Sequence, residues 1–216
     1  MKTWGVIFDW DGVLVDSSRL HERSWEVLAL EEGRELPEGH FRRGFGMKNE
    51  VIIPEVLGWA REKEEVSRLA IRKEAIYRSL VLTEGLDFLP GVKVFLERLR
   101  EAGVGCAIGS STERKNLACV LDGNGGWEWF AEVVSGDLVE RGKPHPDIFL
   151  LAAKRLGVER AVVFEDAMVG IEAARRAGMP VVAVAGTHRA EELVHADRVV
   201  GRLDECTVED VGRLVG

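Results

Sequence analysis

Short apolar runs recur along the chain and alternate with segments whose apolar residues repeat every three or four positions. The runs predict six strands, two of them weaker because they are short. The predicted strands are residues 4–8, 104–108, 161–164 and 181–184, with 132–134 and 198–200 as the weaker pair. The helical spacing predicts helices that end at Gly103, Gly157 and Gly178. Such alternation favours a parallel sheet covered by helices on both faces.

The segment from about Ser17 to about Asp87 interrupts this alternation. It carries helical patterns and no convincing strand, and its clearest helix covers residues 67–80. We therefore expect an α/β core made of residues 1–16 and 88–216, with residues 17–87 inserted as a helical domain. The length of 216 residues suits one full domain with such an insert.

Composition and charge narrow the class of protein. The chain is 46% hydrophobic and carries 29 basic against 37 acidic residues, a net charge of -8. This balance argues against a basic nucleic-acid surface and a polybasic membrane patch. No apolar run approaches the roughly 20 residues that span a bilayer, and the first run reaches Asp9 too soon for a signal peptide.

The cysteines point to a reducing compartment. Cys106, Cys119 and Cys206 are scattered, which suits neither a disulfide framework nor a zinc site. We therefore expect a cytoplasmic globular protein, a monomer or weak dimer, that binds neither nucleic acid nor membranes.

Two aspartates follow the first predicted strand. Asp9 and Asp11 lie two residues apart, so their side chains would point to the same side of an extended chain, and Gly12 allows a sharp turn. Ligands of open α/β sheets bind beyond the carboxyl ends of the strands. A strand exit with solvated acids is the simpler alternative. An EF-hand calcium loop does not fit, because Val13 and Leu20 stand at its fifth and twelfth positions.

Hydroxyl groups follow the second strong strand. A side-chain hydroxyl at Ser110 and the backbone N–H groups beside it could bind an anion at the start of the next helix. An ordinary helix N-cap at Ser110, Ser111 or Thr112 is the alternative.

Two later segments carry further charged groups. Lys143 lies in a loop that opens the next predicted helix and that Pro144 and Pro146 rigidify. Its ammonium could neutralise a phosphate or crowded carboxylates. Glu165 and Asp166 follow the strand at residues 161–164. Together with Asp9 they would supply the oxygen ligands that Mg²⁺ prefers.

The order and spacing of these groups resemble the haloacid dehalogenase-like hydrolase superfamily over essentially the whole chain. Residues 9–13 resemble its first motif, Ser110 the second, Lys143 the third, and residues 165–166 the fourth. The resemblance implies an α/β fold, a Rossmann-like doubly wound parallel sheet core with an inserted α-helical cap domain.

The insert resembles the cap of the β-phosphoglucomutase-like subfamily, as does the stretch of residues 15–18 together with His21 and Trp25. Substrate choice is therefore expected to lie in the insert. Its basic candidates are Arg42, Arg43, Lys48 and Lys73, for each of which surface solubility is the alternative.

Lys73 stands where related caps have a phosphate-facing lysine. His21 stands where they have a hinge histidine, with a structural core histidine as the alternative. Asn49 stands where β-phosphoglucomutases have an arginine.

The resemblance also implies a mechanism. Asp9 would attack phosphorus to form an aspartyl-phosphate, and Asp11 would be the general acid and base. Mg²⁺ would be held by Asp9, by the backbone carbonyl of Asp11 and by Asp166, with Glu165 as a ligand or a support. The catalytic residues would be Asp9, Asp11 and Lys143. The substrate phosphate would be bound by Ser110, Ser111, Lys143 and Gly12.

The leading functional hypothesis is a Mg²⁺-dependent phosphatase of a small phosphorylated metabolite, such as a sugar phosphate. Residues 46–50, 54–59 and 202–205 resemble plastid phosphatases of riboflavin synthesis, whose substrate is 5-amino-6-(5-phosphoribitylamino)uracil. A phosphosugar mutase of the β-phosphoglucomutase type is an alternative that Asn49 weakens. A non-catalytic binding protein of the same fold is a second alternative, which the presence of both Asp9 and Asp11 disfavours.

Overall fold

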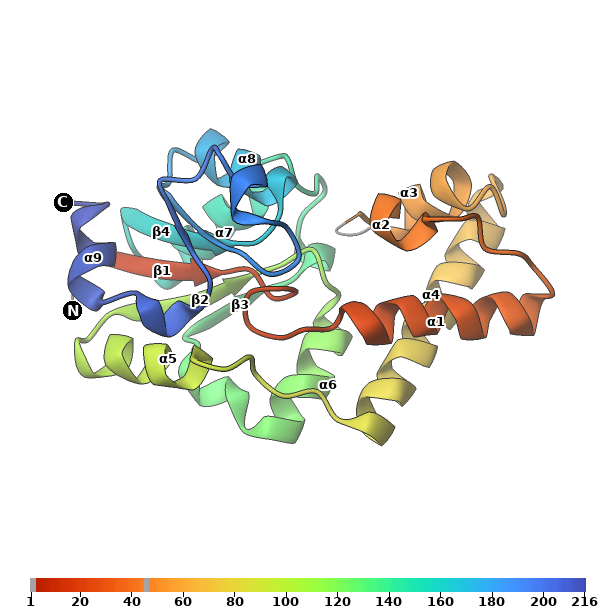
Figure 1. Ribbon diagram of the computed structural model, residues 1–216, viewed down its shortest axis with the longest axis horizontal. Coiled ribbons are helices and arrows are strands. Elements are labelled where there is room, and N and C mark those ends of the chain that lie inside the picture. The colour runs from red at the N-terminus through yellow and green to blue at the C-terminus, as the bar shows by residue number, and fades with distance from the viewer. Residues whose placement is uncertain (1–2, 45–46) are drawn as a thin grey trace. The chain divides into compact units, whose positions relative to one another are not determined.

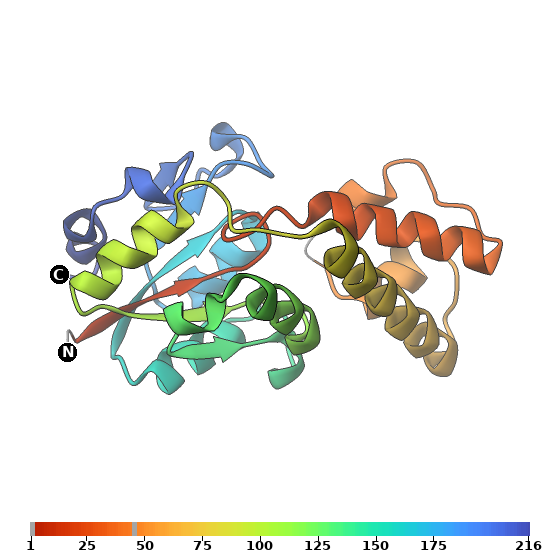
Figure 2. The same cartoon turned by 90° about the horizontal axis from the view of Figure 1, so that it is seen from below.

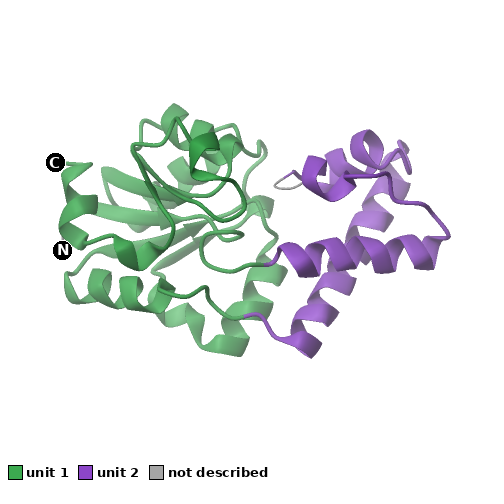
Figure 3. Ribbon diagram, viewed as in Figure 1, with its two compact units in different colours: residues 1–16, 87–216 green, residues 17–86 purple. Residues whose placement is uncertain are grey.

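The structure is a computed structural model that describes residues 3–44 and 47–216. The chain forms two compact units, one made of Met1–Asp16 with Asp87–Gly216 and the other of Ser17–Leu86 (Figure 3). We call the first unit the core and the second the insert. Gly46, the first residue of the 46–50 stretch, lies outside the described residues.

The core is built on a parallel sheet, which confirms the predicted α/β class. Within the described residues the sheet has six strands in the order β3-β2-β1-β4-β5-β6 (Figure 1). Every neighbouring pair is parallel. The strands are β1 Trp4–Phe8, β2 Gly105–Gly109, β3 Glu132–Val134, β4 Arg160–Glu165, β5 Val181–Val184 and β6 Arg198–Val200. All six predicted strands are present. Since the chain runs outward from β1 in one direction and from β4 in the other, the strand order reverses between these two strands.

Helices cover both faces of the sheet. Alternate residues of each strand point to opposite faces, so the apolar strands present side chains that must be buried on both sides. Helix α5, residues Val92–Glu101, runs along one face of the sheet (Figure 2). On this face the ring centroid of Phe8 lies 6.2 Å from that of Phe95. Ile7 packs on the other face in an apolar cluster with Phe149 of α7 and Ile171 of α8. The helices of the core are α5 Val92–Glu101, α6 Arg114–Asn124, α7 Asp147–Leu156, α8 Met168–Arg176 and α9 Val208–Arg213.

All the regular elements in the described part of the insert are helices, and none of its described residues lies in a strand. Its elements are α1 Ser18–Glu32, α2 His40–Gly44, α3 Asn49–Val51, a π-helical turn at Ile52–Val56 and α4 Lys63–Glu84. Trp25, Leu28, Ile53 and Leu69 belong to its own apolar cluster. The predicted helix at residues 67–80 lies within α4.

Ion pairs between exposed arginines and glutamates join α1 to α4 at the surface of the insert. Arg68 forms a two-point contact with Glu32, and Arg72 forms another with Glu31.

Across the described part of the chain, no helix combines the length and apolar character that crossing a membrane requires.

Candidate active site

The carboxyl ends of three adjacent strands bring the predicted motifs to one edge of the sheet. Asp9 follows β1, Ser110 follows β2, and Glu165 and Asp166 end β4 and follow it. Because β1 pairs with both β2 and β4, these ends are neighbours. The N–H of Asp9 also donates to the carbonyl of Phe164 at 2.9 Å, which fixes the end of β1 against β4. This edge lies where the strand order reverses, the usual ligand position in open α/β sheets.

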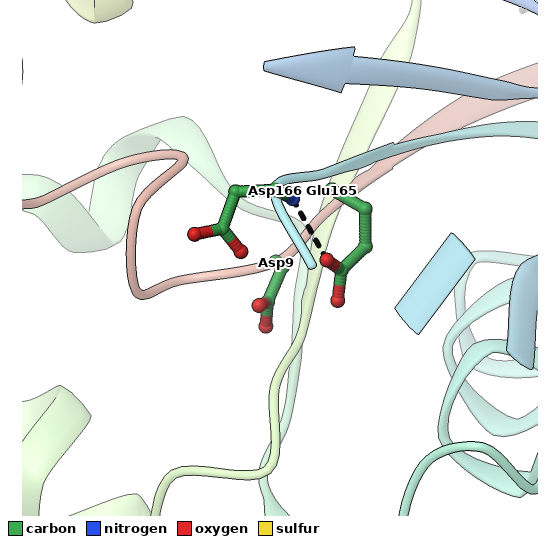
Figure 4. A group of neighbouring side chains, drawn as sticks. All are labelled: Asp9, Glu165 and Asp166. Carbon is green, nitrogen blue, oxygen red and sulfur yellow. Dashed lines mark hydrogen bonds between the residues drawn. The ribbon is translucent and has the colours of Figure 1, made fainter. Parts of the chain in front are cut away.

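Three buried carboxylates converge here. Asp9, Glu165 and Asp166 are 8%, 1% and 1% exposed. One oxygen from each lies within 4.8 Å of the others, and Figure 4 shows the three side chains side by side. The structure therefore brings together three of the residues that the sequence nominated as metal ligands. The donors are all oxygens, which is the set that hard divalent cations prefer.

Lys143 supplies positive charge to this group, which we call the core cluster: Asp9, Lys143, Glu165 and Asp166. Its Nζ lies 2.9 Å from Asp9 Oδ1 and 2.6 Å from Glu165 Oε1, and its side chain is 4% exposed. Burial alone would lower the pKa of Lys143, but the two carboxylates raise it above its usual range. The ammonium is therefore charged at neutral pH.

Both carboxylate oxygens of Glu165 are already engaged. Oε1 accepts from Lys143, and Oε2 accepts from the backbone N–H groups of Asp166 and Ala167, each at 2.7 Å. A Cβ at Gly170 would lie 1.6 Å from Glu165 Oε1, so a glycine in the first turn of α8 makes room for this side chain. Glu165 is thus built into the backbone around the site.

The core cluster is short of positive charge. Burial raises the pKa of Glu165 to about 7, with Lys143 acting against the shift and Asp9 adding to it. Burial, together with Glu165 and Asp9, also raises the pKa of Asp166. Asp166 Oδ2 is buried, and no hydrogen bond of good geometry reaches it from the described residues. Three carboxylates against one ammonium would be stabilised by a cation.

A tight turn carries the chain away from β1. Gly12 has a φ of +75°, and a Cβ there would lie 1.9 Å from Asp166 Oδ2 and 2.7 Å from Thr187 Oγ1. Only glycine fits this close approach without strain. The N–H of Gly12 donates to the carbonyl of Val15 at 2.8 Å, so it serves the turn itself.

Asp11 is fixed by a residue that sequence reasoning considered only as a helix cap. Thr112 Oγ1 donates to Asp11 Oδ2 at 2.6 Å, and the N–H of Thr112 donates to Ser110 Oγ at 3.1 Å. Helix α6 begins at Arg114 with Glu113 at its N-cap position, so the N-cap alternative for Ser110, Ser111 and Thr112 is wrong. Ser110 is buried, and Ser111 is half-buried beside it.

Two more residues near Asp166 were missed. The Thr187 hydroxyl favours the ionised form of the Asp166 carboxyl and so opposes the rise in its pKa. The Nδ1 atom of His188 lies 3.1 Å from the carbonyl oxygen of Asp166. Both residues follow β5, the strand next to β4. This position in the sequence is the feature that could have predicted them as site residues.

A second buried polar group lies within the insert, and we call it the insert cluster: His21, Asn49, Lys73 and Glu74. Lys73 Nζ lies 2.7 Å from His21 Nδ1 and 2.9 Å from Glu74 Oε1. Asn49 Nδ2 donates to Glu74 Oε1 at 2.7 Å. The structure thus brings together three of the four predicted insert candidates, whereas Glu74 was missed.

The charges of the insert cluster are balanced. Burial and the adjacent Lys73 lower the pKa of His21 to about 3, so the imidazole is neutral. Burial acts to raise the pKa of Glu74, but the Lys73 ammonium and the Asn49 hydrogen bond lower it to about 2. The His21 ring stacks on Tyr77 with centroids 3.9 Å apart.

The remaining basic candidates of the insert are dispersed. Lys48 lies at the N-cap position of α3. Arg42 and Arg43 lie in the last turn of α2, where both are exposed and Arg43 donates to the carbonyl of Glu38.

The fold and the strand-end site define a hydrolase of the haloacid dehalogenase-like type. The pattern of the family described as "Hydrolase: haloacid dehalogenase-like hydrolase" matches residues 5–178, and the chain belongs to this family.

The chain is also similar to curated proteins that act on phosphorylated metabolites. The chain is 40% identical to the chloroplastic 5-amino-6-(5-phospho-D-ribitylamino)uracil phosphatase of Arabidopsis thaliana over 97% of its length, but spans only 57% of that protein. It is 33% identical to a phosphorylated carbohydrates phosphatase of Thermotoga maritima, covering 81% of each chain. It is 32% identical to the β-phosphoglucomutase of Bacillus subtilis over 94% of this chain and 92% of that one. The phosphatases among these relatives support a phosphoric monoester hydrolase.

Solved structures show the same fold. CbbY from Rhodobacter sphaeroides, in complex with phosphate, matches with a TM-score of 0.87 at 25% identity. The match covers 98% of this chain and 100% of that one. The β-phosphoglucomutase of Clostridium difficile has a TM-score of 0.85 at 28% identity, covering 97% of this chain and 95% of that one.

Proposed function

We propose that this protein hydrolyses the phosphate monoester of a small polar metabolite, with Mg²⁺, through an aspartyl-phosphate on Asp9. The observation that carries the proposal is the core cluster, in which a buried carboxylate at a strand end lies 2.9 Å from a charged lysine. The phosphatase relatives support the same reaction.

The residues of the core cluster fit Mg²⁺. Asp9 and Asp166 would be its carboxylate ligands, and the backbone carbonyl of Asp11 would be a third ligand. Glu165 holds Lys143 and the backbone of residues 166–167, so it supports the site rather than donating a ligand. When bound, the ion would offset the negative charge of the carboxylates and of the phosphoryl oxygens.

In the first half of the reaction, a carboxylate oxygen of Asp9 attacks phosphorus. The bond from phosphorus to the ester oxygen breaks as the bond to Asp9 forms, and Asp11 gives its proton to the departing alcohol. Ser110 and Lys143 bind the phosphoryl oxygens, with Ser111 beside them. Lys143 is already held in place by Asp9 and Glu165, so little reorganisation is needed.

In the second half, a water molecule attacks phosphorus and gives its proton to Asp11. The bond between phosphorus and Asp9 breaks, inorganic phosphate leaves, and both aspartates return to their starting states.

We propose that the insert is the cap that selects the substrate. The expected end of this domain at residue 87 lies one residue beyond the end of the compact unit at Leu86. The 40% identity to the Arabidopsis phosphatase extends over 97% of the chain, which makes 5-amino-6-(5-phospho-D-ribitylamino)uracil the first substrate to test. We propose a cytoplasmic protein that acts on this class of metabolite without nucleic acid or membrane, as a monomer or weak dimer.

Phosphate release over a panel of phosphorylated metabolites, with Mg²⁺ and with a chelator, tests the proposal. We expect Mg²⁺-dependent release that is fastest with the phosphoribityl compound or a sugar phosphate. If no phosphate monoester is turned over while Mg²⁺ still binds, the chain is a binding protein and the proposal is wrong.

The phosphosugar mutase is the second candidate, favoured by the similarity to β-phosphoglucomutases. Against it, Asn49 stands at the arginine position and bonds to Glu74 rather than presenting a cation. Incubation with β-glucose 1-phosphate separates the two: the phosphatase releases phosphate, whereas a mutase yields glucose 6-phosphate.

A further inference from the structure

We infer that Thr112 is a positioning residue for Asp11, whose carboxylate it orients for proton transfer to and from the substrate oxygen. This inference rests on the proposed function, because it assigns Asp11 the proton-transfer role. It adds a residue that lies outside the four motifs recognised in the sequence.

The backbone of Thr112 is fixed by hydrogen bonds at both its N–H and its carbonyl. Its N–H donates to Ser110 Oγ at 3.1 Å, and its carbonyl accepts from the N–H of Gly136 at 3.0 Å. The side-chain hydroxyl then donates to Asp11 Oδ2 at 2.6 Å. This length is typical of a hydrogen bond to a charged acceptor. Thr112 is therefore a rigid donor aimed at one oxygen of Asp11.

Different parts of the chain hold the backbone and the side chain of Asp11. The backbone lies in a turn closed by Leu14 N to Trp10 O at 2.9 Å and Gly12 N to Val15 O at 2.8 Å. The side chain is half-buried, and two rotatable bonds join its carboxylate to that turn. When one carboxylate oxygen is bound by Thr112, the direction of the other is set as well.

The chemistry of the partner suits a proton-transfer group. A hydroxyl can donate to a carboxylate oxygen and can also accept a hydrogen bond, and it adds no charge beside Asp11. An ammonium can only donate. The two aspartates thus have different partners, since Asp9 faces Lys143 at 2.9 Å and Asp11 faces Thr112.

Thr112 also connects Asp11 to the proposed phosphate site. The Ser110 oxygen accepts from the N–H of Thr112, which leaves the Ser110 hydroxyl proton to donate to a phosphoryl oxygen. A single residue therefore sets the distance between the phosphoryl group and the proton donor. Small displacements at this residue are expected to lower the rate more than the affinity.

The test compares Thr112→Val, which removes the hydroxyl at nearly constant shape, with Thr112→Ser, which retains it. The readout is kcat/KM for an alkyl phosphate and for p-nitrophenyl phosphate, whose leaving group departs without a proton. We expect Thr112→Val to lower the value about 10–100-fold for the alkyl ester, a part of the usual contribution of general acid catalysis. The loss with p-nitrophenyl phosphate should be several times smaller, and Thr112→Ser should restore most of the activity.

Asp11→Asn supplies the second measurement. If Thr112 acts through Asp11, adding Thr112→Val to Asp11→Asn should cause no further loss. Equal losses with both substrates, or additive losses in the double variant, would overturn the inference while leaving the phosphatase intact. If the wild-type protein hydrolyses neither ester, the proposed function fails first. Thr112→Ala, with thermal unfolding of each variant, guards against a folding defect of the valine variant.

Discussion

The core cluster and the insert cluster are both buried and polar, but they differ in their balance of charge. In the insert, Lys73 and Glu74 neutralise each other, and His21 is held neutral. In the core, three carboxylates surround one lysine, and the pKa values of Glu165 and Asp166 are raised. A cluster whose charges are balanced needs no ligand to neutralise it. A cluster with excess negative charge favours the binding of a cation.

This difference separates two uses of buried polar groups. Removing one partner of a balanced pair leaves a buried charge and costs stability. Removing a carboxylate from the unbalanced cluster relieves repulsion and costs function instead. The predictions below make the two clusters respond in opposite directions.

The largest effect is expected for Asp9→Asn, which keeps the shape of the nucleophile and removes its charge. Turnover should fall by a factor on the order of 10⁴ or more, as for other residues that form the covalent intermediate. The fold should survive, because the core cluster still contains two carboxylates for Lys143. Phosphate release and thermal unfolding check this. Activity near that of the wild type would refute the role of Asp9.

In the insert cluster, Glu74→Gln should instead cost stability. It leaves the Lys73 ammonium buried without a counter-charge, which usually destabilises a protein by about 3–5 kcal/mol. Urea unfolding measures the change. The matched control is the double variant Glu74→Gln with Lys73→Met, which removes both charges and should recover at least half of the loss. A neutral Glu74→Gln would show that the pair is exposed to water.

The sequence predicted the sheet well because buried parallel strands are continuous apolar runs. Four of the six strands have the predicted bounds. The strand predicted at 104–108 begins one residue later, because the N–H of Val104 donates to the carbonyl of Leu99 and closes the end of α5. Helix α4 extends beyond residues 67–80 at both ends, and the added turns contain the buried apolar residues Val66 and Val81.

The strand-end residues of the site were also predictable, since their positions follow from the order of the strands. The partners that orient them were not. Thr112 and Asp11 are separated by 101 residues, and their contact depends on two loop conformations. Glu74 looked like one more surface charge on a helix, and only the packing of the insert shows that it neutralises Lys73.

Asp166→Asn should have two opposite effects on the core. It should lower the affinity for Mg²⁺ by about 10–100-fold or more, the usual range for altered metal sites. It should also raise the melting temperature of the metal-free protein, because one crowded carboxylate is gone. Tryptophan fluorescence during Mg²⁺ titration and thermal unfolding in a chelator measure these quantities. The control is Glu172→Gln on α8, an exposed carboxylate that should change neither.

The smallest effect is the response of stability to pH, where the two clusters act with opposite signs. The folded-state pKa of Glu165 is about 7 against an ordinary 4.5, so the folded protein retains a proton that the unfolded chain has lost. This contribution is fully present below pH 4.5 and is lost as the pH rises to about 7. The folded-state pKa of His21 is about 3 against 6.5, so its contribution is lost as the pH falls below 6.5.

Single variants of Glu165 and His21 separate the two opposing contributions to the pH dependence of stability in the metal-free protein. Glu165→Gln should gain stability relative to the wild type as the pH rises from 4.5 to 7, and His21→Asn should gain relative to it as the pH falls from 6.5 to 4.5. Mg²⁺ should raise the melting temperature more at pH 7.5 than at pH 5.5, because its ligands must first lose their protons. Melting temperatures measured across this range in a chelator and in Mg²⁺ provide the comparison. A Glu165→Gln profile parallel to that of the wild type would mean that Lys143 already neutralises the core cluster, which would remove the electrostatic reason for a metal there.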